Sequence, residues 1–281
     1  MSENPNQNLS DVAETLLIPL CIRAIESQRP DALIKDERAV ALVHQMHTDS
    51  SRILAKIAEE TRVAIVLRSR EFDRYARDFL AHYPEAVVVH IGCGLDERFE
   101  RVDNGQVEWY DLDLPEVIEL RRKFIGGEGA RHHLLACSVL DSAWLNSVSL
   151  HRQRPFLFLA EGVLMYFEEP QVKSLVLTLK EHFPGAELVF DAFSPFFVWA
   201  NNRRVARTNI GARCHWALKR GRDLEQWSDG ICLLDEWFPF ACPEPRLARA
   251  LHLARAPWVR HIPLLAKAWG VFHYRLGKTA R

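Results

Sequence analysis

A run of β-branched residues, Val87–Ile91 (VVVHI), leads directly into the turn Gly92-Cys93-Gly94. Further short apolar runs follow at 107–110, 132–137, 156–160 and 188–190, and segments with helical periodicity separate them. Alternation of this kind predicts crossover units and a mostly parallel sheet. Because the first and fourth runs are almost continuously hydrophobic, we expect helices on both faces, which makes the chain α/β with a doubly wound sheet.

The rest of the chain divides around this alternation. Residues 12–77 have helical spacing, and helices are also expected at 114–124 and 169–182, where prolines stand near the first turn. A closing strand is expected at 268–276. We therefore predict four parts: an N-terminal helical segment (1–84), a nucleotide-binding core (85–192), an irregular insertion (193–257) and the closing strand of the core (258–281).

Composition narrows the choice of partners. The 36 Lys and Arg residues balance 37 Asp and Glu residues, so a nucleic acid is not an expected partner. No apolar run is long enough to cross a membrane, and Met1–Leu9 lacks a signal-peptide pattern, so we expect a soluble cytoplasmic protein without a membrane partner. Six scattered cysteines without a CxxC pair indicate reduced thiols, and no side chains have metal-ligand spacing.

The glycine turn and the acids after it favour one kind of cofactor. Glycines after a buried strand let the backbone approach a ligand at the carboxyl edge of the sheet. A dinucleotide fingerprint needs a third glycine where this chain has Glu97, and Asp96 and Glu97 are expected to repel a pyrophosphate. Asp111 and Asp113 end the next strand, where a carboxylate can bind ribose hydroxyls. Adenosine without phosphate fits best, and S-adenosylmethionine is the common cofactor of that kind.

Two segments carry a family resemblance, 90–124 (with GCGLD and DLDLPE) and 158–167 (FLAEGVLMYF). They resemble the leucine carboxyl methyltransferase family, especially its bacterial branch related to polyketide O-methyltransferases of the tetracenomycin type. The resemblance runs from about Glu14 to Ser194. It implies a class I methyltransferase fold with a seven-stranded sheet, S-adenosylmethionine as cofactor, and O-methylation of a hydroxyl or carboxylate on a small, polyketide-like acceptor.

The resemblance also implies roles for residues around the methionine and ribose parts of the cofactor. Arg68 matches the arginine that pairs with the carboxylate of the methionine moiety. Gly92 and Gly94 match the glycines under the cofactor. Asp113 matches the acid that binds the ribose, with Asp111 as the near alternative.

The remaining matches concern the adenine and the acceptor. Ser138 and Val139 match residues around the adenine, and Asp141 is a further partner for its amino group because the family often has an acid in place of Ser138. Glu161 matches the glutamate that faces the methionine end. Tyr166 stands near the expected acceptor and is the candidate for positioning it.

Position and composition also indicate where the acceptor binds. The stretch 193–257 together with Trp258 carries five of the eight tryptophans, and 193–257 has ten Lys or Arg against six Asp or Glu. An insertion that leaves the carboxyl edge of the sheet, with flat aromatic surfaces and positive charge, suits an acidic or phenolate-bearing acceptor. We expect this stretch and the N-terminal helices to cover the acceptor site.

Three alternatives remain open from the sequence. The acceptor could be the carboxyl terminus of a protein, as in the leucine carboxyl branch. A nicotinamide-dependent oxidoreductase would share the fold, although Glu97 and its neighbouring acids disfavour it. A non-catalytic protein that binds S-adenosylmethionine would retain the same pocket. The isolated histidines, among them His90 and His132, are expected to be structural, and the oligomeric state is not predicted.

Overall fold

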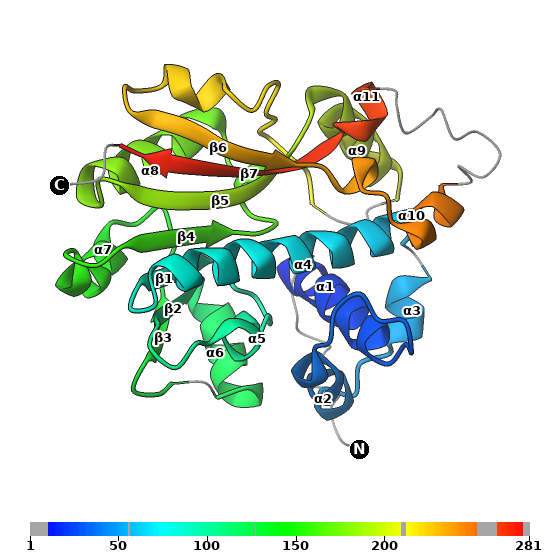
Figure 1. Cartoon of the computed structure of the whole chain (residues 1–281). Coiled ribbons are helices and arrows are strands. Elements are labelled where there is room, and N and C mark those ends of the chain that lie inside the picture. The colour runs from blue at the N-terminus through cyan, green and yellow to red at the C-terminus, as the bar shows by residue number, and fades with distance from the viewer. Residues whose placement is uncertain (1–10, 56, 127, 209–211, 252–262, 278–281) are drawn as a thin grey trace.

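The computed structural model describes residues 11–55, 57–126, 128–208, 212–251 and 263–277. Its centre is a seven-stranded sheet of order β3-β2-β1-β4-β5-β7-β6, in which β7 runs antiparallel to both of its neighbours (Figure 1). The strands are β1 (Val87–Ile91), β2 (Glu108–Asp113), β3 (His132–Ala136), β4 (Phe156–Ala160), β5 (Ala186–Phe193), β6 (Ile231–Trp237) and β7 (Trp269–Leu276). The predicted α/β, mostly parallel sheet is confirmed.

Eleven α-helices lie within the described residues. They are α1 (Asp11–Ser27), α2 (Glu37–Gln45), α3 (Ser50–Leu54), α4 (Glu59–His82), α5 (Arg98–Val102), α6 (Pro115–Phe124), α7 (Ala143–Val148), α8 (Glu169–His182), α9 (Pro195–Thr208), α10 (Pro245–Ala250) and α11 (Pro263–Ala266). Figure 1 shows α1, α9 and α11 gathered at the end of the sheet toward which β4 points. Within the described residues, no helix is long and apolar enough to cross a membrane.

Strand β1 explains why the sheet is buried on both faces. Val87, Val89 and Ile91 pack into one hydrophobic core with residues of α7 and α8. Val88 points to the opposite face, where α4 contributes Phe72 among other apolar side chains. Because successive side chains of a strand alternate between faces, a five-residue apolar strand needs this cover on both sides.

The stretch 193–257 differs from the expected irregular insertion. It opens with α9 and contains β6, which pairs antiparallel with β7 at the edge of the sheet. The prediction of an insertion outside the core is therefore wrong for Ile231–Trp237, which the sheet itself includes. A register shift between Leu233 and Asp235 breaks the alternation of this strand, so its sequence lacks a clear strand pattern. Trp258 lies outside the described residues.

The N-terminal helices contact the glycine turn after β1. A Cβ atom added at Gly94 would lie 3.0 Å from Cδ2 of Leu16 in α1. Farther along α1, Arg23 donates to Asp36 at 2.9 Å, and Asp36 also accepts from Arg101 of α5 at 2.8 Å. Helix α1 is therefore fixed to the core by apolar contact at one point and by buried ion pairs at another.

Candidate cofactor and acceptor site

The turn after β1 requires glycine at two positions. Gly92 and Gly94 have φ angles of 64° and 52°, a region of backbone conformation that favours glycine. A Cβ atom at Gly92 would collide with the side chain of Val163, which follows β4. The N–H of Gly94 donates to Oδ2 of Asp113 at 2.8 Å. The turn thus lies against the ends of both β2 and β4.

The two aspartates at the end of β2 have different surroundings. Asp111 is fully buried, and its carboxylate accepts from Arg121 at 2.6 Å and from the indole of Trp109 at 2.9 Å. Burial alone would raise the pKa of Asp111, but Arg121 and the hydrogen bond from His132 hold that pKa far below its usual range. Asp113 is only partly buried and lies beside the glycine turn. This arrangement favours Asp113 over Asp111 as the ribose ligand.

The acids that follow the glycine turn face the interior. Asp96 accepts from Arg101 at 2.7 Å, and Glu97 accepts from Arg121 at 2.8 Å. Both acids are buried. The expectation that they would repel a pyrophosphate is therefore wrong, because paired and buried carboxylates present little negative charge to a ligand.

Arg68 of α4 lies between two carboxylates. Its Nε donates to Oε1 of Glu161 and its Nη1 donates to Oδ2 of Asp191, both at 2.9 Å. The side chain also stacks on Trp269, with Cζ 4.9 Å from the ring centroid. Its Nη2 makes no hydrogen bond within the part of the chain that the structure describes. A carboxylate such as that of a methionine moiety would complete the donor set of this guanidinium.

Glu161 stands directly after β4, and its largely buried carboxylate accepts from three side chains. Its Oε1 accepts from Arg68 and from Ser69 at 2.8 Å, and its Oε2 accepts from Arg98. Burial would raise the pKa of Glu161, but the guanidinium groups of Arg98 and Arg68 outweigh burial and lower this pKa to about 2. The carboxylate is therefore ionised at neutral pH.

The predicted adenine residues lie in the loop after β3. Val139 and Asp141 line a cavity of about 340 Å³ between α7 and α8, whereas the hydroxyl of Ser138 accepts from the N–H of Leu140 at 3.2 Å. Leu114, directly after Asp113, is an exposed apolar side chain at the same edge of the sheet. An exposed leucine beside the candidate ribose ligand Asp113 suits one face of an adenine, and the sequence analysis did not select it.

Tyr166 lies in the short helical turn 164–166 and is 39% exposed. The neighbouring backbone carbonyl of Met165 accepts from the backbone N–H of His215 at 2.8 Å, which brings the segment before β6 alongside this turn. Asn202 of α9 fixes that segment through two hydrogen bonds with the backbone of Cys214, at 2.7 and 2.9 Å. Loss of hydration and the nearby Cys214 raise the pKa of Tyr166 to about 12, so its hydroxyl is neutral at physiological pH.

Besides Leu114, two charged residues of this site were missed by the sequence analysis. Asp191 stands in the apolar run of β5, and Arg98 is the first residue of α5; both are fully buried. A charged residue within a hydrophobic strand was the signal for Asp191, because burying a charge is costly unless it is paired. No such signal marks Arg98, which stands among charged residues (Glu97, Glu100, Arg101) in a segment without a continuous apolar run.

The histidines of the core belong to the same buried network. His90 faces Asp111 at 3.2 Å and Arg98 at 3.2 Å, and His132 faces Asp111 at 2.8 Å. They contact groups inside the protein, which favours the structural role. Among the described residues, no three His, Cys, Asp or Glu side chains are placed to hold a metal ion.

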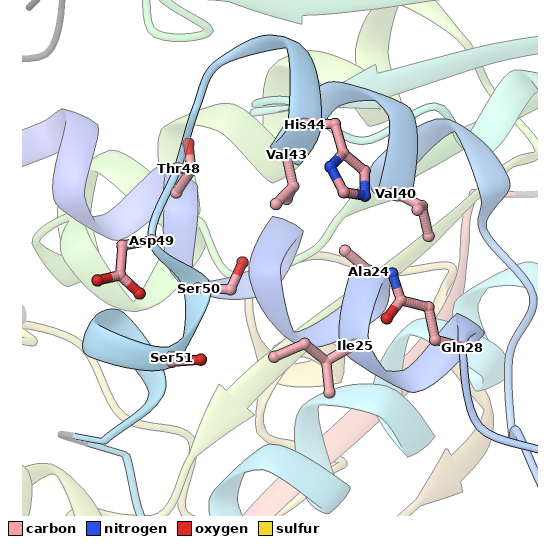
Figure 2. Close-up of a pocket in the computed structure, with 10 residues that line it drawn as sticks. All are labelled: Ala24, Ile25, Gln28, Val40, Val43, His44, Thr48, Asp49, Ser50 and Ser51. Carbon is pink, nitrogen blue, oxygen red and sulfur yellow. The ribbon is translucent and has the colours of Figure 1, made fainter.

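Another cavity, of about 290 Å³, lies among α1, α2 and α3 (Figure 2). Apolar side chains such as Ile25 and Val43 line it together with polar groups such as His44 and Ser50. None of the predicted site residues is among its lining residues. It is therefore separate from the site at the ends of β1, β2 and β4.

Comparison with known proteins agrees with this geometry. The leucine carboxyl methyltransferase profile matches residues 17–180. The chain is 33% identical to the tetracenomycin polyketide synthesis O-methyltransferase TcmP of Streptomyces glaucescens, over 95% of this chain and 97% of that protein. It is 26% identical to the S-adenosyl-L-methionine-dependent methyltransferase dpfgK of Gibberella zeae, over 82% of this chain and 83% of that protein.

Solved structures share the fold. A protein from Thermobifida fusca proposed to be a methyltransferase is similar with a TM-score of 0.58 and 15% identity, over 93% of this chain and 95% of that one. A DUF574 family protein from Streptomyces avermitilis has a TM-score of 0.52 and 16% identity, over 91% and 96% of the two chains. The family match also favours methyl transfer over the nicotinamide alternative. The chain belongs to the leucine carboxyl methyltransferase family and is an S-adenosylmethionine-dependent methyltransferase.

Proposed function

We propose that this protein is an O-methyltransferase that acts on a hydroxyl or carboxylate of a small, polyketide-like acceptor. The observation that carries the proposal is the 33% identity to TcmP over nearly the whole of both chains. The similarity to TcmP continues beyond β5. A resemblance confined to the cofactor-binding core would end at that strand. Protein C-terminal carboxyl methylation is the alternative that the family description favours.

We assign the cofactor roles to residues at the carboxyl edge of the sheet. Arg68 holds the carboxylate of the methionine moiety through Nη2, and Glu161 faces the same end. Gly92 and Gly94 let the backbone approach the cofactor, and Asp113 binds the ribose. The bound cofactor supplies an electrophilic methyl group on a positively charged sulfur.

Around the adenine, we assign contacts to Ser138, Val139, Asp141 and Leu114. The first three belong to one loop, and Val139 and Asp141 line the same cavity. Leu114 adds an apolar surface next to the proposed ribose ligand. Together these residues would hold the adenosine end while Arg68 holds the other.

The chain contributes to methyl transfer chiefly by positioning. Holding two reactants in line contributes about 7 to 11 kcal/mol to lowering a barrier. Tyr166, with its neutral hydroxyl, orients the acceptor by donating a hydrogen bond to it. We propose that the N-terminal helices and α9 cover the acceptor, because α1 contacts the glycine turn and α9 follows β5 directly.

The acceptor class can be tested directly. The protein is incubated with methyl-labelled S-adenosylmethionine and a panel of phenols, aliphatic alcohols, small carboxylic acids and peptides ending in leucine. We expect label in a phenolic or other small acceptor. Label only in the peptides would favour the alternative, and cofactor binding without any transfer would indicate a non-catalytic protein.

Tyr166→Phe tests the acceptor role. Removing the hydroxyl should lower kcat/KM for the acceptor about three- to tenfold, which corresponds to the loss of one hydrogen bond, and should leave S-adenosylhomocysteine affinity unchanged. Because the pKa of Tyr166 is about 12, its hydroxyl stays protonated up to that pH. The rate of the wild type should therefore not change with the ionisation of a tyrosine near pH 10, and the pH–rate profiles of wild type and Tyr166→Phe should have the same shape there. A change in rate near pH 10 that is present in the wild type and absent from Tyr166→Phe would make the tyrosine a proton-transfer group instead.

A further inference from the structure

Asp191 is a charged residue where the sheet is apolar. It is fully buried in β5, within the run Leu188–Phe193 (LVFDAF). Burying a carboxylate is costly unless hydrogen bonds and a counter-charge compensate it. Three groups do so here, since its Oδ1 accepts from the N–H of Gly162 at 2.6 Å and its Oδ2 from Arg68 at 2.9 Å and Trp269 at 2.8 Å.

These contacts fix the direction of the Arg68 guanidinium. Glu161 engages Nε, Asp191 engages Nη1, and the ring of Trp269 covers the planar group at 4.9 Å. Gly162, with φ of 70°, lies so close that an added Cβ atom would be 3.5 Å from Nη1 and Nη2. A planar group held at two nitrogens and along one side can present its third nitrogen in one direction only.

We propose that Asp191 is a positioning residue that aims Nη2 of Arg68 at the carboxylate of the methionine moiety. Trp269 supports it by fixing Oδ2 with the indole N–H and by stacking on the guanidinium. This inference rests on the role assigned to Arg68 under the proposed function. The proposal makes cofactor affinity depend on β5 and β7, two strands that do not contribute residues to the glycine turn.

A pair of ligands separates positioning from general stability. S-adenosylhomocysteine carries the amino-acid carboxylate, whereas 5′-deoxy-5′-methylthioadenosine carries the same adenosine and thioether without it. Asp191→Asn removes the charge and either replaces the Oδ2 acceptor by an amide group or moves it. The Arg68 guanidinium then loses its contact at Nη1 and keeps only the contact of Nε with Glu161. We expect the Kd of S-adenosylhomocysteine to rise at least tenfold and the Kd of methylthioadenosine to stay within twofold. Equal weakening of both ligands, or no weakening, would overturn the proposal.

A double-mutant cycle tests whether Asp191 acts through Arg68. Arg68→Ala should weaken S-adenosylhomocysteine selectively, and adding Asp191→Asn should then change its Kd by less than twofold. Independent, additive losses would mean that Asp191 contacts the ligand directly, and the positioning role would be rejected. If Arg68→Ala itself leaves both affinities unchanged, the assignment of Arg68 under the proposed function fails, which is a separate outcome.

Two further variants control for folding. Glu26→Gln breaks another buried ion pair, with Arg246 at 2.6 Å, away from Arg68, and should leave the ratio of the two Kd values unchanged. Trp269→Phe keeps an aromatic ring but removes the indole donor, and it serves if Asp191→Asn folds poorly. Because one hydrogen bond is lost, Trp269→Phe should raise the Kd of S-adenosylhomocysteine about threefold and leave the Kd of methylthioadenosine unchanged. An unchanged ratio in Trp269→Phe would contradict the proposal.

Discussion

Asp111 and Asp113 are two residues apart, so their side chains leave β2 on the same face, yet they have different partners. Asp111 is surrounded by Arg121, Trp109 and two histidines, whereas Asp113 contacts the backbone of the glycine turn. What separates them is position along the strand. Asp113 is the last residue of β2, at the edge where ligands bind in open α/β sheets.

This difference yields a paired prediction. Asp113→Ala should weaken the binding of S-adenosylhomocysteine about ten- to a hundredfold, because we propose that the carboxylate accepts charge-assisted hydrogen bonds from the ribose. Asp111→Asn should lower the free energy of unfolding by about 3 kcal/mol, because Arg121 loses one of its two buried carboxylate partners and keeps only Glu97. Calorimetric titration and chemical denaturation measure the two effects. If Asp111→Asn remains folded and is the variant that loses affinity, the assignment of the ribose ligand is reversed.

Glu161 gives a pH dependence of stability. Its pKa is about 2 in the folded protein against 4.5 for an unperturbed glutamate. A carboxyl group with a lowered folded-state pKa contributes stability above pH 4.5, and that contribution is lost as the pH falls toward 2. We expect the free energy of unfolding to fall by about 3 kcal/mol more in the wild type than in Glu161→Gln across this range. Parallel pH curves for the two proteins would contradict the assigned ionisation.

At the scale of elements, α9 and the segment before β6 combine exposed and buried aromatic residues. Trp199 of α9 is 55% exposed and lies beside Phe196, with ring centroids 6.0 Å apart. Trp216 is 3% exposed and packs against Phe190 of β5. The tryptophans of this segment therefore differ in burial: Trp216 packs into the core, whereas Trp199 is open to a ligand.

Substitution of these tryptophans should separate the two roles. Trp199→Ala should change acceptor KM while altering the free energy of unfolding by less than about 0.5 kcal/mol, as for most exposed sites. Trp216→Ala should cost about 3 to 5 kcal/mol of stability, because it leaves a cavity in the core, without changing acceptor selectivity. Steady-state kinetics and thermal denaturation supply the readouts. An unchanged acceptor KM in Trp199→Ala would remove α9 from the proposed acceptor site.

At the scale of the whole molecule, buried ion pairs connect the N-terminal helices to the cofactor site. Asp36 pairs with Arg23 and Arg101; Arg101 also pairs with Asp96, and Asp96 pairs with Arg98, which donates to Glu161. The chain of contacts runs from α1 through α5 to the end of β4. Removing an ion pair at the N-terminal end of this network should therefore lower the stability of the whole protein and not only of the nearby helix.

Asp36→Ala tests this connection. It removes the partner of two buried arginines and also the N-cap of α2, where Asp36 accepts from Ala39 at 2.9 Å. We expect a loss of about 3 to 5 kcal/mol of stability because two buried arginines lose a carboxylate that they share, with about 1 kcal/mol more from the cap. Denaturation followed by far-UV circular dichroism and by tryptophan fluorescence should give coincident transitions. A separate early transition in the variant would show that the helices unfold independently of the core.

Local patterns in the sequence were enough to predict most of the sheet and the edge at which the cofactor is expected to bind. Strands β1 to β5 and β7 were predicted because their hydrophobic runs are bounded by glycines and helix starts, which are local signals. Gly92 and Gly94 stand in a sequence pattern that requires left-handed backbone conformations, and their φ angles agree. The family match also depends on this part of the chain.

The pairing of the charges and the place of β6 depend instead on contacts between segments far apart in the chain. Asp96 and Glu97 appear in the sequence as acids at the cofactor edge, but arginines from other elements neutralise them. Asp191 and Arg98 reach the site from separate elements, and β6 gains its place by pairing with β7. Such contacts join residues far apart in the chain, so no local pattern encodes them, and their energy depends on burial that only the folded chain provides.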